Sequence, residues 1–503
     1  MGKHFISVLG TGCYQPCKYE INKKEWETAY IQEAILQIVI GELGVEDKIT
    51  IFLTEEARES NWEDRNYKEF ELEKNKNLDS QDIREGLRNI LVRTYGKDKV
   101  KAVEIPVGKT EEELDEIFEI IYNEIEEGEE VYFDITHGLR NIPMQALTIL
   151  NYARVLKKIT IAGIYYGAYE VMNEETGITP IFNLSRYNEI LEWTSAAEAF
   201  VNAGDGKQIK KVYDRKNKDL DKRKKIIQCE KLSEECKTTS VEKSEIEEKL
   251  LQEQKDMQKI ANVINGIVNL TTCLETGRGK NFSRQNGNNR KSIYGAYLGL
   301  KVALQKINEE QKGMIRPLKP LFDEIEKSIA IFENDGTNAS TGMAAIQWAI
   351  SYQLTQQGYT ALEETMKTVI CEFYGLQGDE MREREWIVSS AMKTLSNKVI
   401  ENKEEKDEGV NLDREAIITY WEKNYKDKRL NEQEIEIAKK IIREIPKEYA
   451  ELVYNVSDNR NNINHFGFKH DPFKCTDLEN KLSEYFLRFQ ELYNKIKIQK
   501  NNK

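Results

Sequence analysis

The chain has 503 residues, 39% hydrophobic and 32% charged, and no stretch approaches the roughly 18–20 uninterrupted apolar residues of a transmembrane helix. This length exceeds what one core supports, so we expect several compact units in a cytoplasmic protein without signal peptide or membrane anchor. The 74 basic and 87 acidic residues give a net charge of −13, which argues against a protein that coats nucleic acid but leaves room for a local basic site.

Apolar runs alternate with amphipathic stretches through the first third of the chain. The apolar runs predict strands at 4–9, 48–53, 100–106, 130–135 and 159–166. Helical periodicity predicts helices at 28–43, 86–95, 110–127 and 143–156. This alternation is typical of βαβ units and a parallel sheet, in which ligands gather at the carboxyl ends of the strands. We therefore predict an α/β, Rossmann-like domain over residues 1–182.

From residue 183 onward the sequence predicts only helices. A stretch dense in Lys and Glu at about 207–259 reads as an exposed helix or a mobile insertion, and 277–289 reads as a polar loop. Helical periodicity follows at 293–307, 318–332, 344–356, 361–373, 380–400, 414–424, 432–453 and 478–498. We therefore predict an all-α domain over residues 183–503 that contains the charged insertion.

The first candidate site is the sequence DITHGLRN at 134–141, which follows a predicted strand and opens a helix. A glycine allows close backbone approach, and the unpaired N–H groups of a helix start attract anions. With the GTG sequence at 10–12, at another strand end, it predicts a phosphate or nucleotide site. The alternative is that the threonine and asparagine only cap the helix and the histidine bonds locally. The candidate ligand-binding residues are Gly10, Thr11, Gly12, Thr136, His137, Gly138, Arg140 and Asn141.

The second candidate site is the sequence SDNRNNINH at 457–465, where we expect Ser457 or Asp458 to cap a helix. Arginine with histidine suits metal-free RNA cleavage, because imidazole moves protons near neutral pH and guanidinium stabilises charge developing on the phosphate. On a regular helix Arg460 and His465 would lie about 140° apart. A compact site therefore needs an irregular helix start or a second copy of the chain. The alternative is a solvated surface helix with an incidental histidine.

The remaining histidines and the cysteines predict no further site. We expect His4 to be structural and His470 to lie in a loop. The seven cysteines are scattered, and only Cys13 and Cys17 lie close together. No second pair or nearby histidine completes a zinc set, so we expect reduced thiols and no metal site.

Three motifs together resemble the CARF–HEPN ribonucleases of type III CRISPR systems: GTGCY at 10–14, DxTHG at 134–138 and RNx₃H at 460–465. The resemblance implies a CARF domain that binds cyclic oligoadenylate, with cyclic tetra-adenylate as the expected activator, in one pocket shared by two copies. It implies a homodimer, or a higher oligomer of dimers, whose HEPN domains cleave single-stranded RNA in antiviral defence. Cleavage would need no metal or other cofactor and would leave a 2′,3′-cyclic phosphate. The implied catalytic residues are Arg460, Asn461 and His465.

Two alternatives remain open at the level of the sequence. The CARF domain would also be a ring nuclease that degrades its own activator, with Thr136, His137 and Arg140 positioning the attacking 2′-hydroxyl. In the second alternative the protein is a non-catalytic regulator that binds cyclic oligoadenylate, and its helical domain only dimerises. Neither the ring size of the activator nor the RNA base preference follows from the sequence.

Overall fold

The structure is a computed structural model that describes residues 2–68, 71, 82–138, 141–232, 240–281, 292–309, 315–378, 380–396, 413–425, 430–468 and 472–501, with backbone alone at 226–232, 240–246 and 501. The chain divides into two compact units, Met1–Leu191 and Glu192–Lys503. The division after Leu191 falls inside helix α7 (Ser185–Ala203), whereas the sequence predicts the boundary after residue 182.

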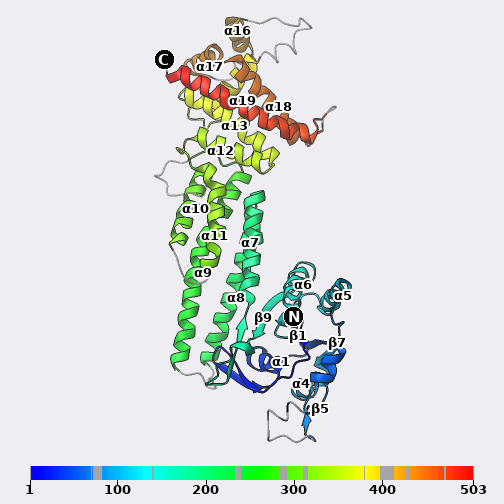
Figure 1. The fold of residues 1–503 in the computed structure, drawn as a ribbon. Coiled ribbons are helices and arrows are strands. Elements are labelled where there is room, and N and C mark those ends of the chain that lie inside the picture. Colours follow the sequence, from blue (N-terminus) through cyan, green and yellow to red (C-terminus); the bar gives the residue numbers. More distant parts are fainter. Residues whose placement is uncertain are drawn as a thin grey trace. The chain divides into compact units, whose positions relative to one another are not determined.

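A mostly parallel eight-stranded sheet forms the centre of the first unit, in the order β3-β2-β10-β9-β8-β1-β4-β7 (Figure 1). Its strands are β1 (Lys3–Leu9), β2 (Cys17–Ile21), β3 (Lys24–Thr28), β4 (Lys48–Leu53), β7 (Val100–Glu104), β8 (Glu130–Asp134), β9 (Thr160–Gly167) and β10 (Ile178–Asn183). The five predicted strands form the parallel part, β7-β4-β1-β8-β9. The hairpin of β2 and β3, together with β10, extends the sheet beyond the prediction. A separate short pair consists of β5 (Arg65–Asn66) and β6 (Ile83–Arg84).

Helices cover both faces of this sheet, which explains why its central strands are almost continuously apolar. In β1, Phe5 and Leu9 join one core, and Ile6 and Val8 join the other. The first core lies under α1 (Ile31–Ile35), η1 (Leu36–Ile40), α2 (Glu55–Ala57), η2 (Arg58–Trp62) and α4 (Leu87–Tyr95). The second lies under α5 (Glu111–Glu124) and α6 (Ile142–Leu156). The short helices η3 (Lys97–Lys99) and η4 (Tyr169–Val171) are connections. The fold class predicted for this part is confirmed.

The described part of the second unit contains only helices, and its first core joins the elements that follow the sheet. These are α7, α8 (Gly206–Leu232), α9 (Ser240–Glu275), α10 (Ile293–Asn308), η7 (Arg316–Leu318), α11 (Lys319–Ile329), η8 (Ala330–Phe332) and α12 (Asn338–Ser351). The charged stretch at 207–259 forms α8 and the first half of α9. Its residues Ile209, Leu220 and Met257 are buried in the core, so its charges occupy the outer faces of helices that pack together.

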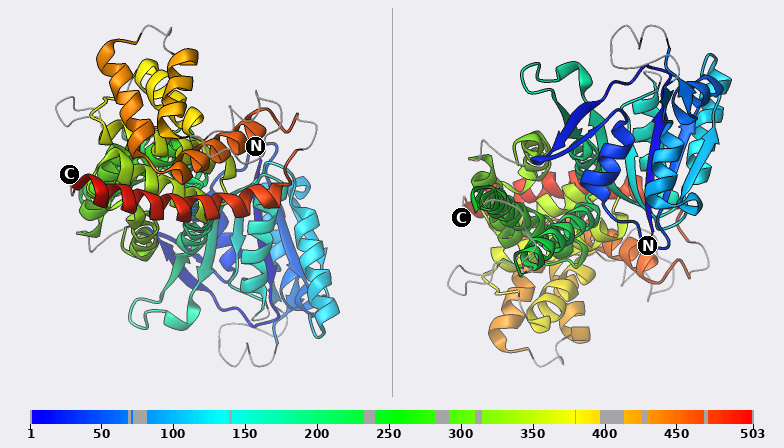
Figure 2. Two further views of the ribbon diagram at one scale, coloured as in Figure 1. Left: turned by 90° about the horizontal axis from the view of Figure 1, so that it is seen from above. Right: turned by 90° about the horizontal axis from the view of Figure 1, so that it is seen from below.

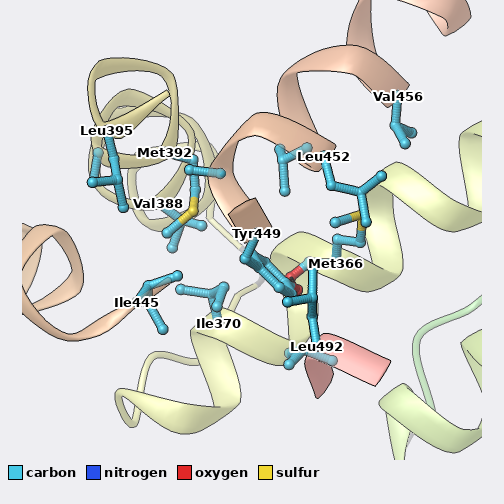
Figure 3. Close-up of a cluster of buried hydrophobic side chains, with 14 of the residues drawn as sticks. Met366, Ile370, Val388, Met392, Leu395, Ile445, Tyr449, Leu452, Val456 and Leu492 are labelled. Atoms are coloured by element: carbon cyan, nitrogen blue, oxygen red, sulfur yellow. Dashed lines mark hydrogen bonds between the residues drawn. The ribbon is translucent and has the colours of Figure 1, made fainter. Parts of the chain in front are cut away.

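A second core holds the rest of this unit together (Figure 3). It joins α12 to α13 (Thr355–Phe373), η9 (Arg382–Ser389), α14 (Ser390–Leu395), α16 (Arg414–Tyr425), α17 (Glu432–Glu444), α18 (Lys447–Asn464) and α19 (Cys475–Asn501). Tyr449 is fully buried there, and its hydroxyl donates to the Met366 carbonyl at 2.8 Å. The long α19 packs along α13 and α18 (Figure 2). The single helix predicted at 432–453 is wrong, because Pro446 separates α17 from α18.

Candidate functional site

The sheet order brings the two predicted ligand loops of the first unit together. The strand order β7-β4-β1-β8-β9 reverses between β1 and β8, and ligands of doubly wound sheets bind at such a switch point. β1 and β8 pair in parallel with Ser7 opposite Asp134, so the loops after both strands leave the same edge. The ring of Tyr14, beyond the first loop, stacks on the ring of His137 in the second, with centroids 4.3 Å apart. The Gly10 N–H donates to the Tyr14 hydroxyl at 2.9 Å.

Asp134, the last residue of β8, holds the second loop to the sheet. Its fully buried carboxylate accepts from the Ser7 hydroxyl at 2.7 Å and from the backbone N–H and hydroxyl of Thr136 at 3.0 and 2.5 Å. Burial raises the pKa of Asp134 to about 6, against the opposing effect of these hydrogen bonds. The Thr136 hydroxyl also accepts from the Gly167 N–H at 2.8 Å. The Asp and Thr of the motif therefore fix the loop to the sheet, while His137 and Gly138 lie beyond this anchor.

His137 and Asn141 place polar atoms without a described partner at the start of α6. His137 is half-buried, and burial lowers the pKa of its imidazole to about 4, so the ring is neutral at pH 7. Among the described residues, neither His137 Nε2 nor Asn141 Nδ2 has a hydrogen-bond partner, although both atoms are buried. Asn141 is the N-cap residue of α6, yet its side chain makes no capping hydrogen bond. These two atoms can therefore serve a ligand.

Both loops are exposed at a glycine, Gly12 in the first and Gly138 in the second. Thr11 and Gly12 are exposed at the edge of the sheet. Gly138 has a φ of 109°, which favours glycine, and a Cβ there would lie 3.1 Å from side-chain atoms of Val8 and Ile142. Arg140 lies outside the described residues.

The second predicted site lies at the end of α18. Arg460 is half-buried, and Asn461 and His465 are exposed. The expectation that Ser457 or Asp458 caps a helix is wrong, because α18 begins at Lys447 and both residues lie in its interior. His465 is the C-cap residue. His470 lies outside the described residues.

Arg460 belongs to a buried charge network on α13. Its Nη1 donates to Glu363 Oε2 at 2.6 Å, and Lys367 Nζ lies 3.0 Å from Glu363 Oε1. Glu363 and Lys367 are 2% and 5% exposed, so most solvent screening is lost. Although burial works to raise it, Lys367 and Arg460 hold the pKa of Glu363 below its usual value. The Ser457 hydroxyl adds a bond to Glu363 at 3.2 Å. The arginine is thus fixed in orientation.

One copy of the chain does not gather Arg460 and His465 into a compact site. Up to Asn464 the helix is regular, so the two residues lie about 140° apart around its axis. Arg460 faces the Glu363 side of the helix, while His465 is exposed at its end. Of the two arrangements left open by the sequence, the irregular helix start does not occur.

A cavity of about 700 Å³ lies beside this network, between the end of α9, α12, α13 and the start of η9. Glu364 and Arg384 line it and pair with each other at 2.7 Å. Glu364 Oε1 also lies 3.9 Å from Arg460 Nη1. The cavity and the arginine therefore share one acidic residue.

Known proteins identify the first unit. Residues 4–170 match the family model described as "CRISPR system endoribonuclease Csx1, CARF domain". The N-terminal unit is a CARF domain. Over 136 residues the chain is 33% identical to the "CRISPR-associated protein MJ1674" of Methanocaldococcus jannaschii. The aligned segment covers 27% of this chain and 21% of that relative. The predicted resemblance to CARF-containing CRISPR-associated proteins is therefore confirmed.

These matches cover a limited part of each chain. The CARF family match ends at residue 170, and the alignment spans about a fifth of the length of the curated relative.

The described residues contain neither a metal-binding cluster nor a membrane-spanning helix. No group of three His, Cys, Asp or Glu side chains there is placed to hold a metal ion. No helix there combines the length and apolar character needed to cross a membrane.

Two residues that the sequence does not predict hold the first loop of the CARF domain. Asn61 Nδ2 donates to the carbonyls of Gly10 and Gly12 at 2.8 and 2.9 Å. Arg84 Nη1 donates to Asn61 Oδ1 at 3.1 Å, and its Nη2 donates to the Tyr14 carbonyl at 3.1 Å. Both side chains are buried. They come from η2 and β6, far from the GTG motif in sequence, and no local pattern marks them.

Proposed function

We propose that the protein is a CRISPR-associated ribonuclease activated by cyclic oligoadenylate, which its CARF domain binds at the switch point between β1 and β8. Support comes from the meeting of the two loops and from the buried polar atoms of His137 and Asn141 that lack a described partner. Adenines offer hydrogen-bonding edges to such atoms, and phosphates suit the positive end of the α6 dipole, where Pro143 supplies no N–H and the Met144 N–H donates to the Asn141 carbonyl. The exposed Thr11 and Gly12 leave the site open to solvent.

The helical unit supplies the proposed cleavage chemistry through Arg460, Asn461 and His465. The observation that carries this assignment is the fixed orientation of Arg460 by the buried Glu363. The Arg460 side chain is 28% exposed, so the part of its guanidinium that Glu363 does not engage can reach phosphate oxygens, whereas its Nε is buried. The ribose 2′-oxygen attacks the adjacent phosphorus as it loses its proton, and the bond to the 5′-oxygen breaks as that oxygen gains one. His465 moves these protons, Asn461 orients the phosphate, and no metal enters.

The active form is a dimer in which two copies build one cleft. The angle of about 140° between Arg460 and His465 supports this arrangement, since residues on different sides of one helix meet more readily across a two-fold axis. The activator changes activity only if it binds the cleavage-competent arrangement more tightly than the idle one. Higher oligomers of this dimer are compatible with the same cleft.

The test is an RNA cleavage assay with cyclic tri-, tetra- and hexa-adenylate in parallel. Activated protein should cut single-stranded RNA in the presence of EDTA and leave 2′,3′-cyclic phosphate ends. His465→Ala should abolish cleavage and keep activator binding and dimerisation. Loss of activity in EDTA, or full activity of His465→Ala, would refute the mechanism.

A second activity concerns the activator itself. The neutral His137 imidazole, with a pKa of about 4 and no described partner at Nε2, supports a role in positioning a 2′-hydroxyl of the ring for attack on its own phosphate. Labelled cyclic tetra-adenylate incubated with His465→Ala protein isolates this activity from RNA cleavage. An intact ring after long incubation excludes it.

A further inference from the structure

The turn after α18 has an unusual residue at its tightest point. Phe466 N–H donates to the Ile463 carbonyl at 2.9 Å, and Gly467 N–H donates to the Asn462 carbonyl at 3.0 Å. This pair of bonds defines a Schellman motif, in which the residue after the C-cap adopts a left-handed conformation and is usually glycine. Here that residue is Phe466, with a φ of 58°. A bulky side chain at such a φ is strained, and strain of this kind concentrates at functional sites.

The same turn exposes two aromatic rings beside His465. Phe466 and Phe468 are 88% and 86% exposed, and they are the most exposed aromatic side chains in the described part of the chain. The Phe468 N–H donates to the His465 carbonyl at 3.0 Å. This bond keeps the backbone of Phe468 next to His465. Burying a phenylalanine normally contributes to stability, and neither ring does so here. Packing among the described residues of this unit therefore does not explain the strained backbone or the two rings.

Single-stranded RNA fits this surface better than a protein partner does. Unstacked bases of RNA loops and single strands stack on exposed aromatic rings, and such stacking tolerates any base. The neighbours of the rings on the helix, Asn461, Asn464 and His465, are polar and exposed, so the apolar surface is confined to one turn. A stable interface between proteins needs about 800 Å² on each side, far more than two rings supply.

We propose that Phe466 and Phe468 stack on the bases that flank the scissile phosphate, an inference that rests on the proposed RNA cleavage. The Schellman turn holds the rings at a fixed place relative to His465, so stacking sets which phosphate reaches the imidazole. RNA whose bases are already paired and stacked cannot use the rings. The pair therefore selects single-stranded over double-stranded RNA.

Phe466→Gly separates this role from a structural one. Glycine relieves the strain at a φ of 58° and removes only an exposed ring, so the melting temperature should stay unchanged or rise. At saturating activator, kcat/KM for a labelled single-stranded RNA should fall about tenfold, and about a hundredfold when Phe468→Ala is added. The control Leu487→Ala removes a 61% exposed side chain from α19 and should leave kcat/KM unchanged.

An RNA with abasic sites beside the scissile bond provides the decisive comparison. If the rings stack on those bases, kcat/KM of wild type should fall about a hundredfold on the abasic RNA, and the variant that lacks both rings should lose little further activity on it, because the contacts are already gone. Equal kcat/KM for wild type and the double variant on intact RNA overturns the proposal, and so does conversion of the double variant to a monomer in sedimentation, which would make the turn a protein interface.

Failure of this proposal is distinguishable from failure of the proposed function. If wild type cleaves no RNA with any activator, RNA cleavage is refuted, and binding of the labelled RNA to His465→Ala protein still decides the stacking. Tighter binding of the labelled RNA by His465→Ala protein than by the same protein with Phe466→Gly and Phe468→Ala added supports stacking. Equal dissociation constants overturn it.

Discussion

Glu363 is the residue whose removal tests the charge network most sharply. Glu363→Gln keeps the shape of the side chain and removes its charge, leaving Arg460 without its closest carboxylate and the buried Lys367 without the only fully buried carboxylate that contacts it in the described part of the chain. Breaking a buried ion pair costs about 3–5 kcal/mol. We expect about 3 kcal/mol, the lower end, because Glu385 and Glu364 still lie 2.9 and 3.6 Å from Lys367 Nζ. The control Glu364→Gln changes a side chain that is 43% exposed and should cost less than about 1 kcal/mol.

Guanidinium unfolding of both full-length variants at pH 7 measures this difference. The pKa of Glu363 is lower in the folded than in the unfolded state, so its contribution is complete above the unfolded value of about 4.5 and is lost as the pH falls through the folded value. The deficit of Glu363→Gln should therefore shrink in acid. Cleavage by Glu363→Gln should show a lower kcat with little change in KM, because Arg460 is misoriented. Equal stabilities of the two variants at pH 7 would refute the buried network.

Three further predictions concern the CARF domain. Gly138→Ala should destabilise the protein by about 1–2 kcal/mol and weaken activator binding in calorimetry, whereas Gly177→Ala, at a φ of 66° with open space around it, should leave binding intact. The pKa of His137 is about 4 when folded and near 6.5 when unfolded, so stability relative to His137→Phe should fall by up to about 3 kcal/mol as pH drops from 7 to 4, and a constant difference in thermal melts would contradict this. Asn61→Ala should weaken activator binding about tenfold by freeing two loop carbonyls, and unchanged affinity would show that the loop holds itself.

The parallel part of the sheet follows from the sequence because its strands are buried on both faces and read as unbroken apolar runs. β3 has the sequence KEWET and is mostly exposed, so its charged residues give no apolar run that would predict a strand. The helix predicted at 28–43 therefore begins too early, at the last residue of β3. Apolar periodicity continues across Pro446 and conceals the break between α17 and α18. In both places the pattern of apolar residues indicates which side chains are buried but not where a helix begins or ends.

The candidate sites likewise contain residues that the sequence predicts and residues that it does not. The loops after β1 and β8 could be placed together, because parallel strands end at one edge and both motifs follow strands. Asn61 and Arg84 could not be found, since their role arises only when η2 and β6 fold back on the loop. Glu363 and Lys367 are four residues apart on α13, a spacing that is typical of ion pairs on exposed helix faces, whereas both are buried under α18.

Cleavage of single-stranded RNA by wild type and His465→Ala, each with and without cyclic tetra-adenylate, tests the central claim most directly. Wild type should be nearly inactive alone and strongly activated by the ring in EDTA, while His465→Ala binds the ring and cleaves nothing. Cleavage that ignores the activator, or that survives in His465→Ala, would contradict the assignment of sensing to the CARF domain and of cutting to the end of α18.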